Sequence, residues 1–118
     1  MAVPNEAARA YRIDLLFVTL AAFALYAANF DYLIRGDASQ YADYIIRSDF
    51  HELRLHFGFY AVVWLVQHSL GSVLGLTVPQ TMVWVNVVAG AITVGTMYAF
   101  SRELLGGRAE ALVATLIY

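Results

Sequence analysis

The sequence predicts an all-α fold: a polytopic bundle of transmembrane helices with a short interfacial helix between its first two spans. The first observation is composition, because 61% of the 118 residues are hydrophobic and 14% are charged, whereas an ordinary soluble domain is nearer half apolar and a quarter charged. The second is the placement of charge, which gathers at the amino terminus, between Asp31 and His56, and between Arg102 and Glu110. The nearly charge-free stretches between these clusters indicate an integral membrane protein.

Four apolar runs are predicted as membrane spans, near 13–32, 57–76, 82–101 and 109–118. A spanning helix needs about 20 residues and rarely fewer than about 17. The last run starts at Ala111 and its eight residues would cover only about 12 Å of the roughly 30 Å of hydrocarbon. We therefore expect residues 1–118 to form one membrane domain at the front end of a longer chain.

A polar insert, residues 31–56, separates the first two spans and is too long for a tight turn. Asp37 is predicted to cap a helix, with Gln40 three residues later at the position that completes a capping box. The segment that follows is amphipathic, so we predict an interfacial helix over 38–50 with its apolar side toward lipid or protein.

The side chains of this predicted helix divide into two faces. Tyr41, Ile45 and Phe50 lie close to one apolar stripe. Asp43 and Arg47 lie on another face and are four residues apart, a spacing at which opposite charges pair on a helix.

The composition also excludes several classes of function. A net charge of −2, with seven basic residues that are all Arg, offers no surface for a polyanion, so we expect no nucleic-acid partner. The chain has no Cys, which excludes disulfides and thiolate chemistry. It carries no phosphate-binding glycine loop, zinc-protease motif or nucleophile elbow, and we expect no metal. The expected partners are membrane lipid and other transmembrane helices.

Three stretches carry a family resemblance. GDASQYADYI (36–45) places an acid before a Tyr-Ala pair on a juxtamembrane helix, and LRLHFGFYAVVWLVQHSLG (53–71) enters the second span through a basic residue and a His. NVVAGAITVGTMYAFSRELLGGRAEALVATLIY (86–118) ends a span in a Leu-Leu-Gly turn before an Ala-Leu-rich helix. In this order they resemble the start of the GT-C superfamily of polyprenyl-phosphate-sugar-dependent glycosyltransferases, especially its protein O-mannosyltransferase and aminoarabinose-transferase branch.

The resemblance implies that a sugar is transferred from a polyprenyl-phosphate donor at the outer face of a bacterial or archaeal plasma membrane. Asp37 matches the family's catalytic acid, although it can serve as a helix cap alone or in both roles. Arg54 and His56 would bind the donor phosphate, or they mark the membrane surface. The chain departs from the family where Ala38 replaces a frequent second acid and where Phe57-Gly58 follows His56 in place of Pro-Pro. The lipid-phosphate donor is the one cofactor-like ligand expected.

Polar and small residues inside the predicted spans are candidates for helix packing. His68 lies beside Gln67, about eleven residues into the predicted second span, where an ionisable group usually has a protein partner. Interhelical hydrogen bonding is its favoured role, and haem or pigment ligation is the alternative. Asn86 is interpreted in the same way, and Ala91, Gly95 and Ala99 are four apart, which lets another helix approach closely.

A second function stays open at this point: a non-catalytic helical subunit that packs in a larger respiratory or photosynthetic complex. The intact mass of the native polypeptide separates the two, because a complete transferase of this superfamily has many more spans. Both functions need close helix packing, so the small residues of the third span do not discriminate between them.

Two observations disagree about which side of the membrane holds the amino terminus. If the spans alternate, the amino-terminal tail and the 77–81 turn lie on one side and carry two Arg. The 31–56 insert and the 101–110 turn lie on the other side and carry five. Counting Arg alone therefore puts the amino terminus outside. The resemblance implies a cytoplasmic amino terminus, because lipid-phosphate donors are used at the outer face and the matching acid lies in the insert. We expect the cytoplasmic placement, with Arg in the insert contacting phosphate or head groups.

Overall fold

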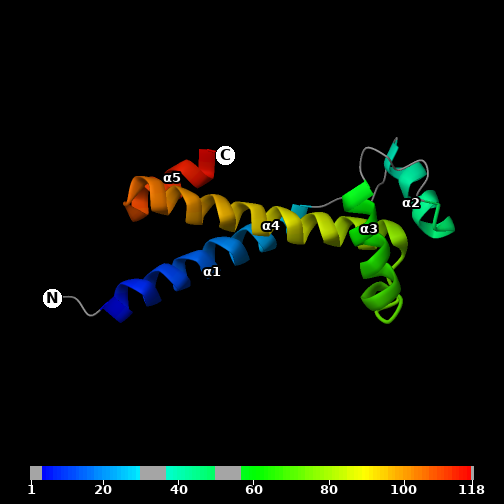
Figure 1. Cartoon of the computed structure of the whole chain (residues 1–118), viewed down its shortest axis with the longest axis horizontal. Helices are drawn as coiled ribbons and strands as arrows, with labels where there is room; N and C mark the ends of the chain where they lie inside the picture. The colour runs from blue at the N-terminus through cyan, green and yellow to red at the C-terminus, as the bar shows by residue number, and fades with distance from the viewer. Residues whose placement is uncertain (1–3, 30–36, 50–56, 118) are drawn as a thin grey trace. The chain divides into compact units, whose positions relative to one another are not determined.

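The computed structural model describes residues 4–29, 37–49 and 57–117, and all regular secondary structure in these ranges is helical (Figure 1). The all-α prediction is confirmed for this part of the chain. The elements in order are α1 (Pro4–Asn29), α2 (Asp37–Arg47), α3 (Phe57–Val66), the π-helical segment η1 (Gln67–Gly71), α4 (Val78–Leu105) and α5 (Arg108–Ile117).

Two helices in the described ranges, α1 from Glu6 onward and α4, are long and apolar enough to cross a membrane by length and composition. They contain 24 and 28 residues, so the length of each helix exceeds the roughly 30 Å of a hydrocarbon core. Both begin earlier than the sequence predicted. Pro4 opens α1, since its fixed φ suits a first helical turn, and the expected polar tail is therefore largely helical.

The early start of α4 has a local cause. Gln80 Oε1 accepts a hydrogen bond from the backbone N–H of Thr77 at 2.8 Å, and the Gln80 N–H donates to Thr77 Oγ1 at 3.4 Å. This reciprocal pair is a capping box. It sets Thr77 as the cap, and Pro79 then occupies the first turn, where its missing N–H costs nothing.

The stretch predicted as the second span, residues 57–76, consists of ten residues of α3, five of η1 and five that follow outside a regular helix. In η1 the ladder shifts to bonds between residues five apart, such as Ser72 N–H to Gln67 O and Leu76 N–H to Gly71 O, both 2.8 Å. Gly75, with φ +68°, lies in the turn that follows. The regular α-helix here is thus shorter than the ~17 residues that a span needs.

The chain divides into two compact units, residues 30–87 and residues 1–29 with 88–118. Unit 30–87 has a core in which α2 packs against α3. Its buried members are Ala42, Ile45, Tyr60, Val63 and Met82. The Tyr41 and Tyr60 rings also stack with their centroids 4.5 Å apart. Part of the predicted stripe of α2 therefore faces protein.

The predicted interfacial helix ends at Arg47, three residues before the predicted end. Ser48 takes a left-handed conformation with φ 55°. Its N–H donates to Ile45 O and the Asp49 N–H donates to Tyr44 O, which is the Schellman pattern of a helix C-terminus. The predicted pair is confirmed, because an Arg47 Nη2 lies 3.0 Å from Asp43 Oδ2. Phe50 lies outside the described residues.

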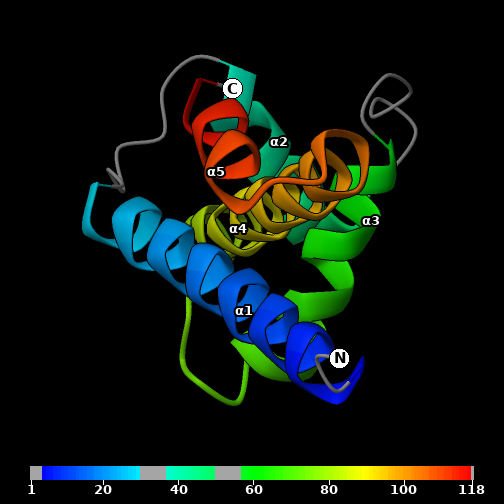
Figure 2. The same ribbon diagram turned by 90° about the vertical axis from the view of Figure 1, so that its left-hand side faces the viewer.

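In the other unit, α1 lies across the second half of α4, and α5 turns back beside the end of α4 (Figures 1 and 2). Gly106, with φ +71°, ends α4, and its N–H donates to Arg102 O at 3.1 Å. This is the left-handed cap that glycine favours. The prediction that the Gly106–Gly107 pair stops a helix is confirmed.

Candidate functional site

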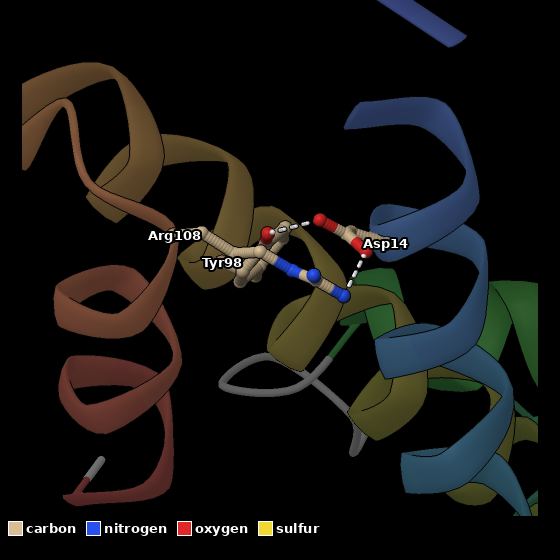
Figure 3. Close-up of polar contacts among 3 residues, drawn as sticks. All are labelled: Asp14, Tyr98 and Arg108. Atoms are coloured by element: carbon tan, nitrogen blue, oxygen red, sulfur yellow. Dashed lines mark hydrogen bonds and ion pairs between the residues drawn. The ribbon is translucent and has the colours of Figure 1, made fainter. Parts of the chain in front are cut away.

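A polar cluster joins three helices in the unit formed by 1–29 and 88–118. Asp14 of α1 faces both Tyr98 of α4 and Arg108 of α5 (Figure 3). Arg108 Nη2 donates to Asp14 Oδ1 at 2.8 Å, and the Tyr98 hydroxyl donates to Asp14 Oδ2 at 3.4 Å. The Asp14 side chain is 15% exposed and the Arg108 side chain 67%. One carboxylate therefore connects all three helices.

Local structure places each member of the cluster. Arg108 is the first residue of α5, so the Gly106–Gly107 turn sets its position. The Arg102 guanidinium donates to the Gly106 carbonyl and ties this turn to α4. Tyr98 is completely buried, so its ring packs among apolar groups and its hydroxyl reaches the carboxylate.

The arrangement favours a structural role for Asp14. A cation engages one carboxylate oxygen and a hydroxyl donor engages the other, so burial of the charge is offset by both contacts. No buried side-chain N or O within the described ranges lacks a hydrogen-bond partner. Those ranges also contain no group of three or more His, Cys, Asp or Glu that could hold a metal. The ion pair and the hydrogen bond to Asp14 therefore stabilise the packing of the three helices.

The predicted catalytic residue stands at the beginning of α2, since Asp37 is the first residue of that helix. Its side chain, and with it the predicted cap, lies outside the described residues, as do Arg54 and His56. A helix thus begins at the acid expected from the resemblance. The three residues of the predicted sugar-transfer site stay predictions.

His68 has its contacts within its own helical stretch. Its Nδ1 lies 2.9 Å from the carbonyl oxygen of Trp64, and the two rings stack with centroids 4.3 Å apart. The imidazole is exposed on η1. Trp64 also donates through Nε1 to Ser48 Oγ at 3.0 Å, which connects α3 to the end of α2. The predicted interhelical bond of His68 stays a prediction, and so does the role of Asn86, which is exposed on α4.

The small residues of α4 lie where α1 approaches. A Cβ placed on Gly95 would collide with Thr19 Oγ1 and lie 3.7 Å from Leu15 Cδ1. A Cβ on Gly90, which the sequence did not single out, would lie 2.9 Å from Tyr26 Cε2. Of the other two predicted members, Ala91 is 3% exposed and Ala99 is half-buried.

A second polar cluster, in unit 30–87, joins η1 to α4. Thr81 Oγ1 donates to Gln67 Oε1 at 2.5 Å, and Gln67 Nε2 donates to Leu76 O at 3.0 Å. Gly71 leaves room for this contact, because a Cβ there would lie 2.9 Å from both the Gln67 and the Thr81 oxygen. Thr81 is fully buried. Gln67 and Thr81 therefore close the chain reversal between η1 and α4.

Sequence reasoning missed both clusters, although their signals were present. Asp14 stands at the start of an apolar run, where an acid needs a partner, and a lone Gln inside an apolar stretch carries the same signal. The partners, Arg108 and Thr81, follow 94 and 14 residues later, and no spacing rule connects residues on different helices.

Comparison with protein-family models, curated proteins and solved structures finds nothing that matches this chain.

Proposed function

We propose that this chain is an integral membrane protein in which α1 and α4 cross the bilayer. The observation that supports this proposal is the exposed surface of α1. In the most apolar 18-residue stretch of α1 only 6% is buried in the protein, compared with 22% in the corresponding stretch of α4. Large apolar side chains on α1 are exposed, among them Leu16, Phe17, Leu20 and Leu25. Water is a poor environment for so much apolar surface, and acyl chains supply the cover that the protein does not.

On this scaffold we propose a glycosyltransferase of the GT-C type that uses a polyprenyl-phosphate sugar at the outer face. The support is the position and character of α2. It follows α1 after a short connection and begins at Asp37, and its Ala42 and Ile45 are buried while Ser39 and Gln40 are exposed. An amphipathic helix next to a span is where the resemblance places the family acid. Asp37 would then act as base toward the acceptor hydroxyl.

A non-catalytic packing subunit is the second candidate, and a different observation favours it. Apolar side chains are exposed along α4 as well, with Ile92 58% and Phe100 56% exposed. Asp14, which contacts two other helices, has both of its carboxylate oxygens engaged. A helix surface of this kind suits contact with further transmembrane helices.

Two measurements test these proposals in order. Resistance of the protein to alkaline carbonate extraction, with release by detergent, is expected of an integral membrane protein. Transfer of labelled sugar from a polyprenyl-phosphate donor is then measured in membranes that contain the full-length protein. Asp37→Asn should lower the rate about 100-fold or more, the range that a general base contributes.

Asp43→Asn is the matched control, since it removes an acid from the same helix that is engaged only in a surface ion pair. Equal activity of the Asp37 and Asp43 variants would refute catalysis by Asp37. Absence of any transfer by the unaltered protein, together with co-purification of larger membrane subunits, would favour the packing role.

A further inference from the structure

We infer that α1 and the second half of α4 cross the membrane antiparallel, so that the amino terminus and the Gly106–Gly107 turn share the cytoplasmic face. The inference rests on the proposed membrane location. It departs from the three alternating spans expected from the sequence, which place these two segments on opposite faces.

The direction of the helices follows from contacts inside one compact unit. Along α1, Asp14 contacts Tyr98, Thr19 faces Gly95 and Tyr26 faces Gly90. The partner on α4 moves backward as the residue on α1 moves forward, which defines an antiparallel pair. Two antiparallel spans have the start of the first and the end of the second at the same face.

The ion pair fixes that face independently. Asp14 lies near the start of the apolar part of α1, and Arg108 is the first residue after the turn that ends α4. Their charged atoms are 2.8 Å apart, whereas opposite faces of the hydrocarbon are separated by about 30 Å. Both residues therefore belong to one membrane surface.

The chain between the two spans must then leave and return at the other face. The ten residues of α3, followed by five of η1, fit this requirement. The regular α-helix of this stretch contains ten residues before the π-helical segment begins, fewer than the ~17 that a span needs. Residues 57–76 enter the bilayer surface without crossing it.

In this topology the face that holds the amino terminus carries more Arg than the opposite face. The face with the amino terminus now carries Arg9, Arg12, Arg102 and Arg108, which is four of the seven Arg in the chain. The other face carries the remaining three. The excess now indicates a cytoplasmic amino terminus. It also leaves α2 and Asp37 at the outer face, so the positive-inside rule and the proposed sugar transfer no longer conflict.

Single Cys substitutions test the inference, because the chain has no native Cys. Four exposed positions report the four segments: Ala8, Ser39, Ser72 and Glu103. Intact cells are treated with a membrane-impermeant maleimide, and permeabilised cells give the total reactive Cys. We expect labelling of Ser39→Cys and Ser72→Cys in intact cells, and of Ala8→Cys and Glu103→Cys only after permeabilisation.

Three alternating spans give a different pattern, in which Ser72→Cys is protected and Glu103→Cys is labelled, and this result would overturn the inference. Val73→Cys, at a site 80% exposed, repeats the Ser72 test if that variant is poorly made. Failure of the membrane proposal itself is distinct, since the protein would then be released by carbonate whatever its labelling pattern.

Discussion

The two compact units of this chain are held together by different means. Unit 30–87 has a closed apolar core of α2 and α3, with stacked Tyr rings and a buried Gln–Thr contact. The unit of α1, the second half of α4 and α5 has close approaches at glycines and one carboxylate shared by three helices. Most of the α1 surface stays uncovered.

The difference shows which interactions stabilise each unit. In unit 30–87 the side chains exclude solvent from one another, so burial of apolar area contributes most. In the other unit, the helices present apolar groups outward and small or polar groups inward. Helices in lipid associate through close packing and hydrogen bonds, because a hydrophobic driving force between them is absent.

The largest expected effect lies in the apolar core. Ile45 is completely buried, whereas its neighbour Ile46 is 64% exposed. Ile45→Ala should lower the free energy of unfolding of unit 30–87 by about 2–5 kcal/mol through lost packing, while Ile46→Ala should change it by about 0.5 kcal/mol or less. Hydrogen exchange of the α2 amides in detergent measures both. Equal losses would mean that the buried face of α2 is not the one that carries Ile45.

The polar cluster should respond next. Asp14→Asn removes the charge that Arg108 contacts and should destabilise the unit by about 1–3 kcal/mol, the range for hydrogen bonds to charged groups. Arg108→Gln should cost at least as much, because it leaves the Asp14 carboxylate, which is only 15% exposed, without its cation. Thermal unfolding in nanodiscs gives each value.

A double-mutant cycle on this pair shows whether the contact exists in the membrane. The combined variant should lose less than the sum of the two single losses, because residues in contact couple. Strict additivity would contradict the ion pair and weaken the antiparallel arrangement with it.

A smaller effect is expected at the glycine approach. A methyl group at Gly95 meets Thr19 Oγ1, and rotation of Thr19 relieves the contact but breaks its 2.8 Å bond to Leu15 O. Gly95→Ala should therefore destabilise by about 1 kcal/mol, and added Thr19→Ala should restore part of the loss. Gly58→Ala is the control, because nothing lies within 4 Å of that Cβ. A loss at Gly58 equal to that at Gly95 would exclude close packing as the cause.

The surface pair on α2 should contribute least. The side chains of Asp43 and Arg47 are at least half exposed, so Asp43→Ala should change stability by about 0.3–0.5 kcal/mol. The effect should shrink as salt rises, since mobile ions screen exposed charges. A loss that persists in 1 M salt would show that Asp43 has a partner other than Arg47.

The sequence predicted well what local pattern decides. The all-α class, the Asp43–Arg47 pair and the stop at Gly106–Gly107 follow from composition, spacing and glycine, and each is confirmed. The helix starts at Pro4 and Val78 were placed too late, although the Thr77–Gln80 capping box was readable. This capping box precedes the apolar run from which the span at 82–101 is predicted.

What escaped prediction depends on contacts between distant helices. Asp14 has partners 84 and 94 residues away, and periodicity along one helix carries no information about them. The hydrogen bond from Thr81 to Gln67, the first residue of η1, likewise crosses a chain reversal. The proposed catalytic site differs from both of these cases. Its acid, Asp37, was assigned from the family resemblance and not from a physical property of the residues around it.

The long separation between Asp14 and Arg108 has a consequence for biosynthesis. At about 5–20 residues per second, a ribosome needs roughly 5–20 s to extend the chain from one to the other, a separation of 94 residues. Throughout that interval the carboxyl group of Asp14 lacks the cation that it contacts in the complete unit. The contact between Asp14 and Arg108 therefore forms only after α5 has been synthesised. Under the proposed membrane location, released chains that end after Ile117 should hold α1 in the membrane more firmly than released chains that end after Leu105.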